Sequence, residues 1–180
     1  MRSAVFFDRD GVLIEDRPDF VRDWQDVAIL PAAERALAFI APSDFMVVIA
    51  SNQSGIGRGI VSKETVDSVN ARLVKHFENL GGRIDRIYIC PHHPDAGCDC
   101  RKPKPGMLLR ARDELDIDLS GSFLIGDALR DAAAAAAAGV HPLMVLTGRA
   151  EAGEGEWSGP TYQDAEDAVK WIINSRVHGP

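Results

Sequence analysis

The chain has 180 residues and a formal net charge of -7 at neutral pH. An acidic protein repels the phosphate backbone, so we expect no nucleic-acid partner. Hydrophobic residues make up 46% of the chain, which is enough for one buried core, and we predict a single domain over residues 1–180. No apolar run approaches the roughly 20 residues that span a bilayer, so we expect no membrane partner.

Short apolar stretches predict strands that are covered on both faces, because they are rich in branched and aromatic residues and lack alternation. They cover residues 3–8, 45–50, 86–90, 122–126 and 142–146. Helices are predicted over residues 31–41 and 164–174, from Ser62 to Gly81, from Pro105 onward and across the alanine run that ends at Gly139. Strands that alternate with helices predict an α/β domain with a parallel sheet, whose ligands bind beyond the carboxyl ends of the strands.

Two aspartates, Asp8 and Asp10, directly follow the first predicted strand and precede Gly11. Side chains two residues apart on a strand point to the same side, and two carboxylates forced together repel each other. A cation or a shared proton relieves this repulsion. The pair therefore indicates a divalent-metal site with a nucleophilic carboxylate, and an ordinary acidic turn is the alternative.

Polar residues also follow the later strands. Residues 51–59 (SNQSGIGRG) offer a hydroxyl, amides and glycines that suit an oxyanion, although a flexible glycine loop has the same composition. Residues 101–106 (RKPKPG) place cations on a loop stiffened by prolines, and a solvated basic turn is the alternative. Asp127 follows the fourth strand, where it joins the site or caps the alanine helix.

All three cysteines lie within one short segment, as Cys90, Cys98 and Cys100, beside His92 and His93. Three thiolates and one imidazole make a closed tetrahedral set for a structural Zn²⁺ ion, whereas a metal-free loop of reduced thiols is the alternative. An odd, clustered cysteine count does not build a disulfide framework. We therefore expect a cytoplasmic protein without a signal peptide.

An acid pair, a serine, a lysine and a further acid in this order resemble the haloacid dehalogenase superfamily of phosphotransferases. The resemblance implies a three-layer Rossmann-like domain with a central parallel sheet and no large cap. It implies that Asp8 is the nucleophile that forms an aspartyl-phosphate, and that Asp10 is the general acid and base. Ser51 and Lys102 would bind the phosphoryl group. Mg²⁺ would be bound by the Asp8 carboxylate, the Asp10 carbonyl and Asp127.

The motifs DRDG, SNQSGIGRG, CPHHP, CDCRKPKPGML and IGD together are similar to the heptose-bisphosphate phosphatase group of this superfamily. This resemblance implies hydrolysis of D-glycero-D-manno-heptose 1,7-bisphosphate to the 1-phosphate by a monomer. Asn52, Gln53, Arg101 and Lys102 would bind the substrate, and His92 would be the fourth zinc ligand. Hydrolysis of histidinol phosphate is the alternative within the same chemistry. A zinc-stapled interaction module without activity is the alternative from another class.

For several remaining residues we expect structural roles only. We expect Trp157 and Trp171 to anchor the core, since the last predicted helix carries Trp171 at helical spacing from apolar neighbours. We expect Arg130 and Asp131 to lie on the surface or to cap a helix.

Overall fold

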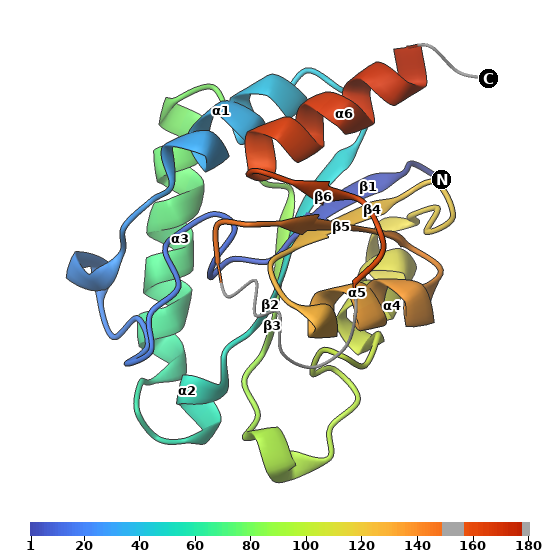
Figure 1. The fold of residues 1–180 in the computed structure, drawn as a ribbon. Coiled ribbons are helices and arrows are strands. Elements are labelled where there is room, and N and C mark those ends of the chain that lie inside the picture. The colour runs from blue at the N-terminus through green and yellow to red at the C-terminus, as the bar shows by residue number, and fades with distance from the viewer. Residues whose placement is uncertain (149–156, 178–180) are drawn as a thin grey trace.

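Six parallel strands form one sheet at the centre of the computed structural model, which describes residues 1–148 and 157–177 (Figure 1). The strands are β1 (Ala4–Phe7), β2 (Met46–Asn52), β3 (Arg86–Cys90), β4 (Phe123–Gly126), β5 (His141–Val145) and β6 (Thr161–Tyr162). Their order is β3-β2-β1-β4-β5-β6, and every pairing is parallel. The five predicted strands are confirmed, and the two-residue β6 was missed because it is too short to show a pattern.

Helices cover both faces of the sheet. They are α1 (Pro31–Ile40), α2 (Ser54–Gly57), α3 (Lys63–Asn79), α4 (Gly106–Leu115), α5 (Leu129–Ala138) and α6 (Ala165–Val177). The five predicted helices are confirmed, whereas α2 forms inside the segment that was interpreted as a glycine loop. None of the helices in the described residues combines the length and the hydrophobicity that crossing a membrane requires.

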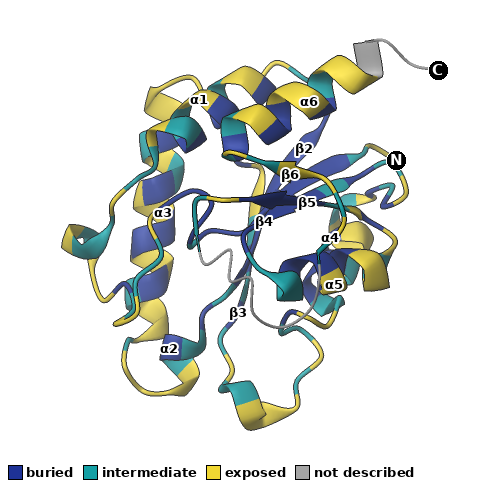
Figure 2. Cartoon of the chain, viewed as in Figure 1, coloured by how far each residue is buried: buried dark blue, intermediate teal, exposed yellow. Residues whose placement is uncertain are grey.

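The first strand divides two hydrophobic cores, because successive side chains of a strand point to opposite faces. Val5 and Phe7 pack with residues of α1, α3 and α6 on one face. Ala4 and Phe6 pack with residues of α4 and α5 on the other face. The buried strands between partly exposed helices are visible in Figure 2. The arrangement confirms the predicted three-layer α/β class.

The strand order places a ligand crevice at the carboxyl end of β1. This strand pairs with β2 on one side and with β4 on the other. The first three strands therefore extend the sheet in one direction from β1, and the last three extend it in the opposite direction. In open α/β sheets the connections leave two such strands in opposite directions, and ligands bind in the crevice between them. Asp8 follows β1 and Asp127 follows β4, and the fold therefore brings these two acids to the same crevice.

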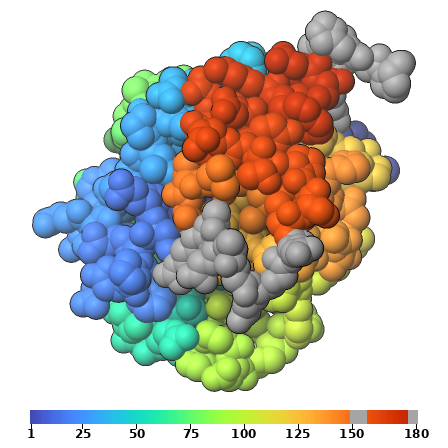
Figure 3. All heavy atoms as spheres, viewed as in Figure 1, coloured from blue at the N-terminus to red at the C-terminus, as the bar shows by residue number. Residues whose placement is uncertain are grey.

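The expectation that Trp171 anchors the core is wrong. The side chain of Trp171 is 41% exposed, while Ala168 and Ile172 of the same helix are fully buried. Positions 168 and 172 are one turn apart and face the core, where α6 packs against α1 (Figure 3). Residue 171 lies to the side of this stripe, and its ring contacts Phe123 edge-on at 6.0 Å between centroids.

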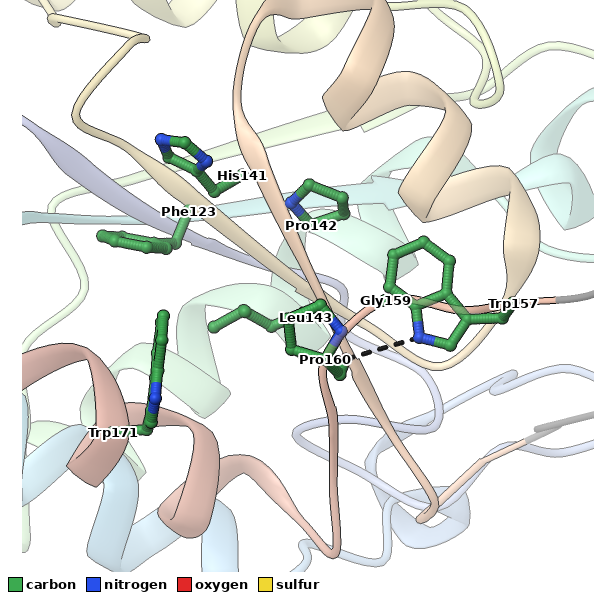
Figure 4. A pocket seen from close by; sticks show the side chains of 8 residues that line it. All are labelled: Phe123, His141, Pro142, Leu143, Trp157, Gly159, Pro160 and Trp171. Atoms are coloured by element: carbon green, nitrogen blue, oxygen red, sulfur yellow. Dashed lines mark hydrogen bonds between the residues drawn. The ribbon is translucent and has the colours of Figure 1, made fainter. Parts of the chain in front are cut away.

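The expectation for Trp157 is also wrong, since this residue is half-buried and its indole N–H donates to the Thr161 hydroxyl at 3.1 Å. Together with Trp171 it lines a mostly apolar pocket over the amino ends of β4 and β5 (Figure 4). In parallel strands the amino ends and the carboxyl ends lie at opposite edges of the sheet. This pocket is therefore separate from the crevice at Asp8.

Truncating a core residue of α3 should destabilise the protein far more than truncating an exposed one. We expect Leu73→Ala to lower the free energy of unfolding by about 2–5 kcal/mol, because the fully buried side chain leaves a cavity. Leu80→Ala is the matched control, since Leu80 is 50% exposed just beyond the same helix. Urea unfolding measures both changes, and equal losses would contradict the packing described for this face.

Candidate active site

A lysine and two aspartates form a buried charge cluster in the crevice. The Lys102 ammonium lies 3.0 Å from Oδ2 of Asp8 and 2.7 Å from Oδ1 of Asp131. The three side chains are between 0% and 4% exposed. Burial lowers the pKa of Lys102, but the carboxylates of Asp131 and Asp8 outweigh it and raise that pKa above its usual value. Lys102 is therefore a permanent cation beside the expected nucleophile.

Hydrogen bonds to β2 fix the position of Lys102, which lies on the loop between β3 and α4 and outside any helix or strand. The Asn52 side chain donates to the Lys102 carbonyl and accepts from the Lys102 N–H, both at 3.0 Å. The Lys102 ammonium also donates to the Ala50 carbonyl at 2.7 Å. Both groups of the Asn52 amide are thus used within the protein. Its expected contact with substrate stays a prediction.

Asp127 completes a cluster of three acids. One oxygen from each of Asp8, Asp127 and Asp131 lies within 4.8 Å of the others. A Cβ atom would lie 2.4 Å from Asp127 Oδ2 if added to Gly11, and 2.1 Å if added to Gly148. Gly11 also has a φ of +85°, a region that favours glycine. These two glycines let the main chain pack directly on the Asp127 carboxylate.

The expectation for Asp131 needs correction. It does cap a helix, since Oδ2 accepts from the Ala128 N–H at 3.1 Å, but it is also 1% exposed and pairs with Lys102. Its Cβ can approach because Gly126 has no side chain; a Cβ there would lie 2.3 Å away. The sequence does contain a signal: Asp131 lies in the first turn of the helix that follows Asp127, so both acids are at the same strand end.

The charges of this cluster call for a cation. Three carboxylates against the Lys102 ammonium leave two negative charges, of which the partly buried Arg130 guanidinium beside the same acids balances one. Without an ion, burial and the neighbouring carboxylates of Asp131, Asp127 and Asp10 raise the pKa of Asp8 to about 7, although Lys102 opposes them. A small number of carboxylates suits Mg²⁺, which takes its remaining ligands from waters and phosphate oxygens. The donor set therefore fits magnesium.

Asp10 faces a different set of partners. Its Oδ1 accepts from Arg9 Nη2 at 3.0 Å, and its Oδ2 accepts from Arg9 Nε at 3.1 Å and from Gln53 Nε2 at 2.7 Å. Burial raises its pKa, but Arg9 and Gln53 outweigh burial and lower that pKa overall. Asp10 is therefore ionised in the free site, and it must gain a proton before it can act as the expected general acid.

Gln53 and Ser51 lie beside this carboxylate. Gln53 donates to the Ser51 hydroxyl at 2.9 Å, and that hydroxyl lies 3.4 Å from Asp10 Oδ2. Gln53 Oε1 accepts from Arg9 at 2.9 Å, so both ends of the amide have partners in the protein. The structure thus brings Ser51 to the crevice as expected. Substrate binding by Gln53 stays a prediction.

Arg101 precedes Lys102 and supplies a second cation. Its Nη1 atom is buried and has no hydrogen-bond partner among the described residues. A buried guanidinium nitrogen without an acceptor is costly. An anionic ligand would provide that acceptor, and the arginine fork suits a phosphate.

The cysteine cluster has the dimensions of a tetrahedral metal site. Cys98 Sγ lies 3.6 Å from the sulfurs of both Cys90 and Cys100, and His92 Nδ1 lies 3.2 Å from Cys100 Sγ. Zn–S bonds of about 2.3 Å predict sulfur separations of about 3.8 Å. His93 instead faces Asp95, whose N–H donates to its Nδ1 at 3.3 Å. His92 is therefore the imidazole of this cluster.

The three thiols differ in acidity. Burial raises the pKa of Cys98, but hydrogen bonds from the Arg101 backbone and from the other two cysteines outweigh it and lower that pKa overall. Without metal, burial first and then its two cysteine neighbours raise the pKa of Cys100 to about 12. Burial likewise raises the pKa of Cys90. A metal ion with four ligands offsets the cost of assembling three sulfurs, as structural zinc does.

Glycines seat the cysteine loop against its neighbours. A Cβ on Gly57 of α2 would lie 2.2 Å from the His93 nitrogen, and a Cβ on Gly106 of α4 would lie 2.3 Å from the Asp99 carbonyl. The loop is therefore packed backbone to backbone between two helix segments. Arg101 and Lys102 follow this loop directly, so its position sets theirs.

Comparison with known proteins agrees with this geometry. Residues 99–169 match the model of the HAD-hydrolase-like family. The chain is 41% identical to the D-glycero-beta-D-manno-heptose-1,7-bisphosphate 7-phosphatase of Bordetella bronchiseptica over 81% of its length and 82% of that protein. It is 39% identical to the enzyme of the same name from Pseudomonas aeruginosa, over 82% of its length and 83% of that protein.

A solved structure is similar over nearly the whole fold. The crystal structure of D,D-heptose 1,7-bisphosphate phosphatase from B. bronchiseptica, complexed with magnesium and phosphate, superimposes with a TM-score of 0.90. The two chains are 34% identical, and the match covers 96% of this chain and 99% of that one. The expected superfamily is confirmed. The chain belongs to the haloacid dehalogenase-like hydrolases, in the family of these heptose-bisphosphate phosphatases.

Proposed function

We propose that this enzyme hydrolyses the 7-phosphate of D-glycero-D-manno-heptose 1,7-bisphosphate through an aspartyl-phosphate on Asp8. The observation that carries the proposal is the buried Lys102 ammonium, 3.0 Å from Asp8 beside two further acids. Phosphoryl transfer requires positioning and charge neutralisation above all, and this cluster supplies both. Relatives of that name at 39–41% identity support the substrate.

In the first half-reaction, an oxygen of Asp8 attacks the phosphorus and the bond from phosphorus to the sugar oxygen breaks. Asp10 donates a proton to the departing oxygen. The negative charge of the arriving phosphate opposes the effect of Arg9 on the Asp10 pKa, so Asp10 takes up its proton with the substrate. The Ser51 hydroxyl binds the phosphoryl oxygens during transfer. Lys102 binds them by exchanging one of its three acceptors within the protein for a phosphoryl oxygen.

In the second half-reaction, a water attacks the phosphorus of the aspartyl-phosphate. Asp10, now ionised, accepts the proton of that water, and the bond from phosphorus to Asp8 breaks. Phosphate leaves and the Asp8 carboxylate is restored. Lys102 remains charged throughout, since its carboxylate neighbours raise its pKa.

The carboxylates of Asp8 and Asp127, with the Asp10 carbonyl, would bind Mg²⁺. Asp131 lies close enough to join them or to position Lys102. When bound, magnesium neutralises charge on the phosphoryl oxygens and keeps Asp8 ionised. The two glycines that pack against Asp127 support this placement.

Substrate contacts fall to the residues around the crevice. Arg101 offers a buried nitrogen that lacks an acceptor and suits a phosphate. Asn52 and Gln53 line the same strand end, and we propose that they contact the substrate as well as the protein. Histidinol phosphate is the competing substrate, because its phosphate ester would meet the same catalytic groups.

The cysteine loop carries the second candidate metal site. We propose that Cys90, His92, Cys98 and Cys100 bind a structural Zn²⁺ ion that fixes the loop leading to Arg101. A closed set of four ligands leaves no position for a reacting water, which separates this ion from catalysis.

We further propose a single-domain monomer that works in the cytoplasm without a nucleic-acid or membrane partner, as the net charge of -7 favours.

Replacing the nucleophile should remove activity without unfolding the protein. We expect Asp8→Asn to lower kcat by at least about a thousandfold, because an amide cannot attack phosphorus. Acid quenching of a reaction with labelled substrate should trap phosphate on the wild type and none on the variant. Asp44→Asn is the control, since Asp44 is exposed before the amino end of β2. Substantial turnover by Asp8→Asn would refute this assignment.

The zinc assignment predicts different behaviour for two adjacent histidines. Elemental analysis should find about one zinc per wild-type chain. His92→Gln and Cys98→Ser should lose it, because each removes a ligand. His93→Gln should retain it, because that ring faces Asp95 instead. Zinc retained by all three variants, or absent from the wild type, would contradict the site.

Substrate preference separates the two phosphatases. We expect kcat/KM for the heptose bisphosphate to exceed that for histidinol phosphate by at least about tenfold, a difference of about 1.4 kcal/mol in transition-state binding. Assays with Mg²⁺ present measure both constants. The reverse preference would assign the enzyme to histidinol phosphate, and activity on neither would favour the module without catalysis.

A further inference from the structure

One polar residue, Asn70, lies on the face of α3 that packs against the core. Its side chain is 6% exposed, and its buried neighbours on this face are Val66, Val69, Leu73 and Phe77. Asparagine is a weak helix former, and a buried amide is costly unless its polar atoms are bonded. Core packing alone would favour an apolar residue at this position. Asn70 therefore has a role that hydrophobic burial does not supply.

The partner of Asn70 is Arg9, which stands between the two aspartates of the DRDG motif. The Asn70 Oδ1 atom accepts from Arg9 Nη1 at 3.0 Å. Arg9 is itself 2% exposed, and its other nitrogens donate to both oxygens of Asp10 and to Gln53. A guanidinium is a rigid planar fork, so the acceptor at one end sets the direction of the other end.

We propose that Asn70 is a positioning residue, which orients the Asp10 carboxylate through the buried Arg9 guanidinium. This inference rests on the proposed function, in which Asp10 transfers the proton. Asp10 lies in the turn after β1, whereas Asn70 is fixed in the middle of a helix of 17 residues. The helix thus supplies a rigid reference for a carboxylate on a turn.

Removing the acceptor should displace Asp10. A buried guanidinium nitrogen that loses its partner turns toward another acceptor, because an unpaired buried donor is unfavourable. The Asp10 carboxylate, bonded to that guanidinium at 3.0 and 3.1 Å, moves with it. Proton transfer depends steeply on the distance between donor and acceptor, so a small displacement slows it.

The leaving group distinguishes this effect from general damage. When Asp8 takes phosphate from an alkyl ester, the departing oxygen needs the proton of Asp10. When it takes phosphate from p-nitrophenyl phosphate, the departing phenolate spreads its charge over the ring and leaves without a proton. A misplaced Asp10 therefore slows the alkyl ester selectively, and kcat/KM reports this first transfer. A purely structural defect slows both substrates equally.

The experiment compares Asn70→Leu with wild-type enzyme in the presence of Mg²⁺. One substrate is an alkyl phosphate, either heptose 1,7-bisphosphate or histidinol phosphate, whichever the wild type prefers. The other substrate is p-nitrophenyl phosphate. We expect kcat/KM to fall by about tenfold or more for the alkyl ester and by less than about twofold for the aryl ester. Asn70→Asp keeps the acceptor and should restore the wild-type ratio. Asn79→Leu, at an exposed position of the same helix, is the matched control.

The outcomes separate this inference from the proposed function. Equal losses on both substrates, or no loss on either, overturn the role of Asn70. Circular dichroism checks folding, and if Asn70→Leu does not fold, Asn70→Ser takes its place and is judged by the same ratio. A wild type that is inactive on both substrates overturns the proposed function, and this inference with it. An active wild type with unselective loss overturns this inference alone.

Discussion

The burial of one ammonium among carboxylates is the constraint on which the rest of the structure depends. Lys102 and Asp8 would each be too costly to remove from water alone, and each is tolerated because the other is 3.0 Å away. Their partners come from separate elements: Ala50 and Asn52 from β2, and Asp131 from α5. The loop between β3 and α4 is thereby fixed at the carboxyl edge of the sheet.

The two candidate metal sites contribute in different ways. The acids at Asp8 and Asp127 offer only a few oxygen ligands, so a Mg²⁺ ion bound there would take its other ligands from phosphate oxygens and water. The cysteine cluster forms a complete set of four ligands and has no room for a substrate. A metal ion bound there would influence the active site only through the position of its loop, which packs closely on Gly57 and Gly106 of the neighbouring helices.

Much of the site could be predicted because parallel strands end at one edge of the sheet. Apolar runs locate those ends, and Asp8, Ser51 and Asp127 follow from them. Side-chain direction could not be predicted. The burial of Asp131 depends on the missing Cβ of Gly126, and Gln53 turns toward Arg9 because a buried guanidinium needs acceptors. Trp171 was misassigned because helical spacing shows which residues share a stripe but not how wide the buried stripe is.

The central place of β1 in the sheet has a consequence for folding. Phe7 pairs with Ile49 on one side and with Ile125 on the other, so the strand is completed by segments far along the chain. Pairings with such large sequence separation raise the contact order, and the loop entropy is lost before the contacts compensate for it. The acids at the carboxyl ends of β1 and β4 therefore come together only when these two distant strands have paired. A fragment of the chain that lacks β4 and α5 cannot assemble the acid cluster, since Asp127 follows β4 and Asp131 lies in α5.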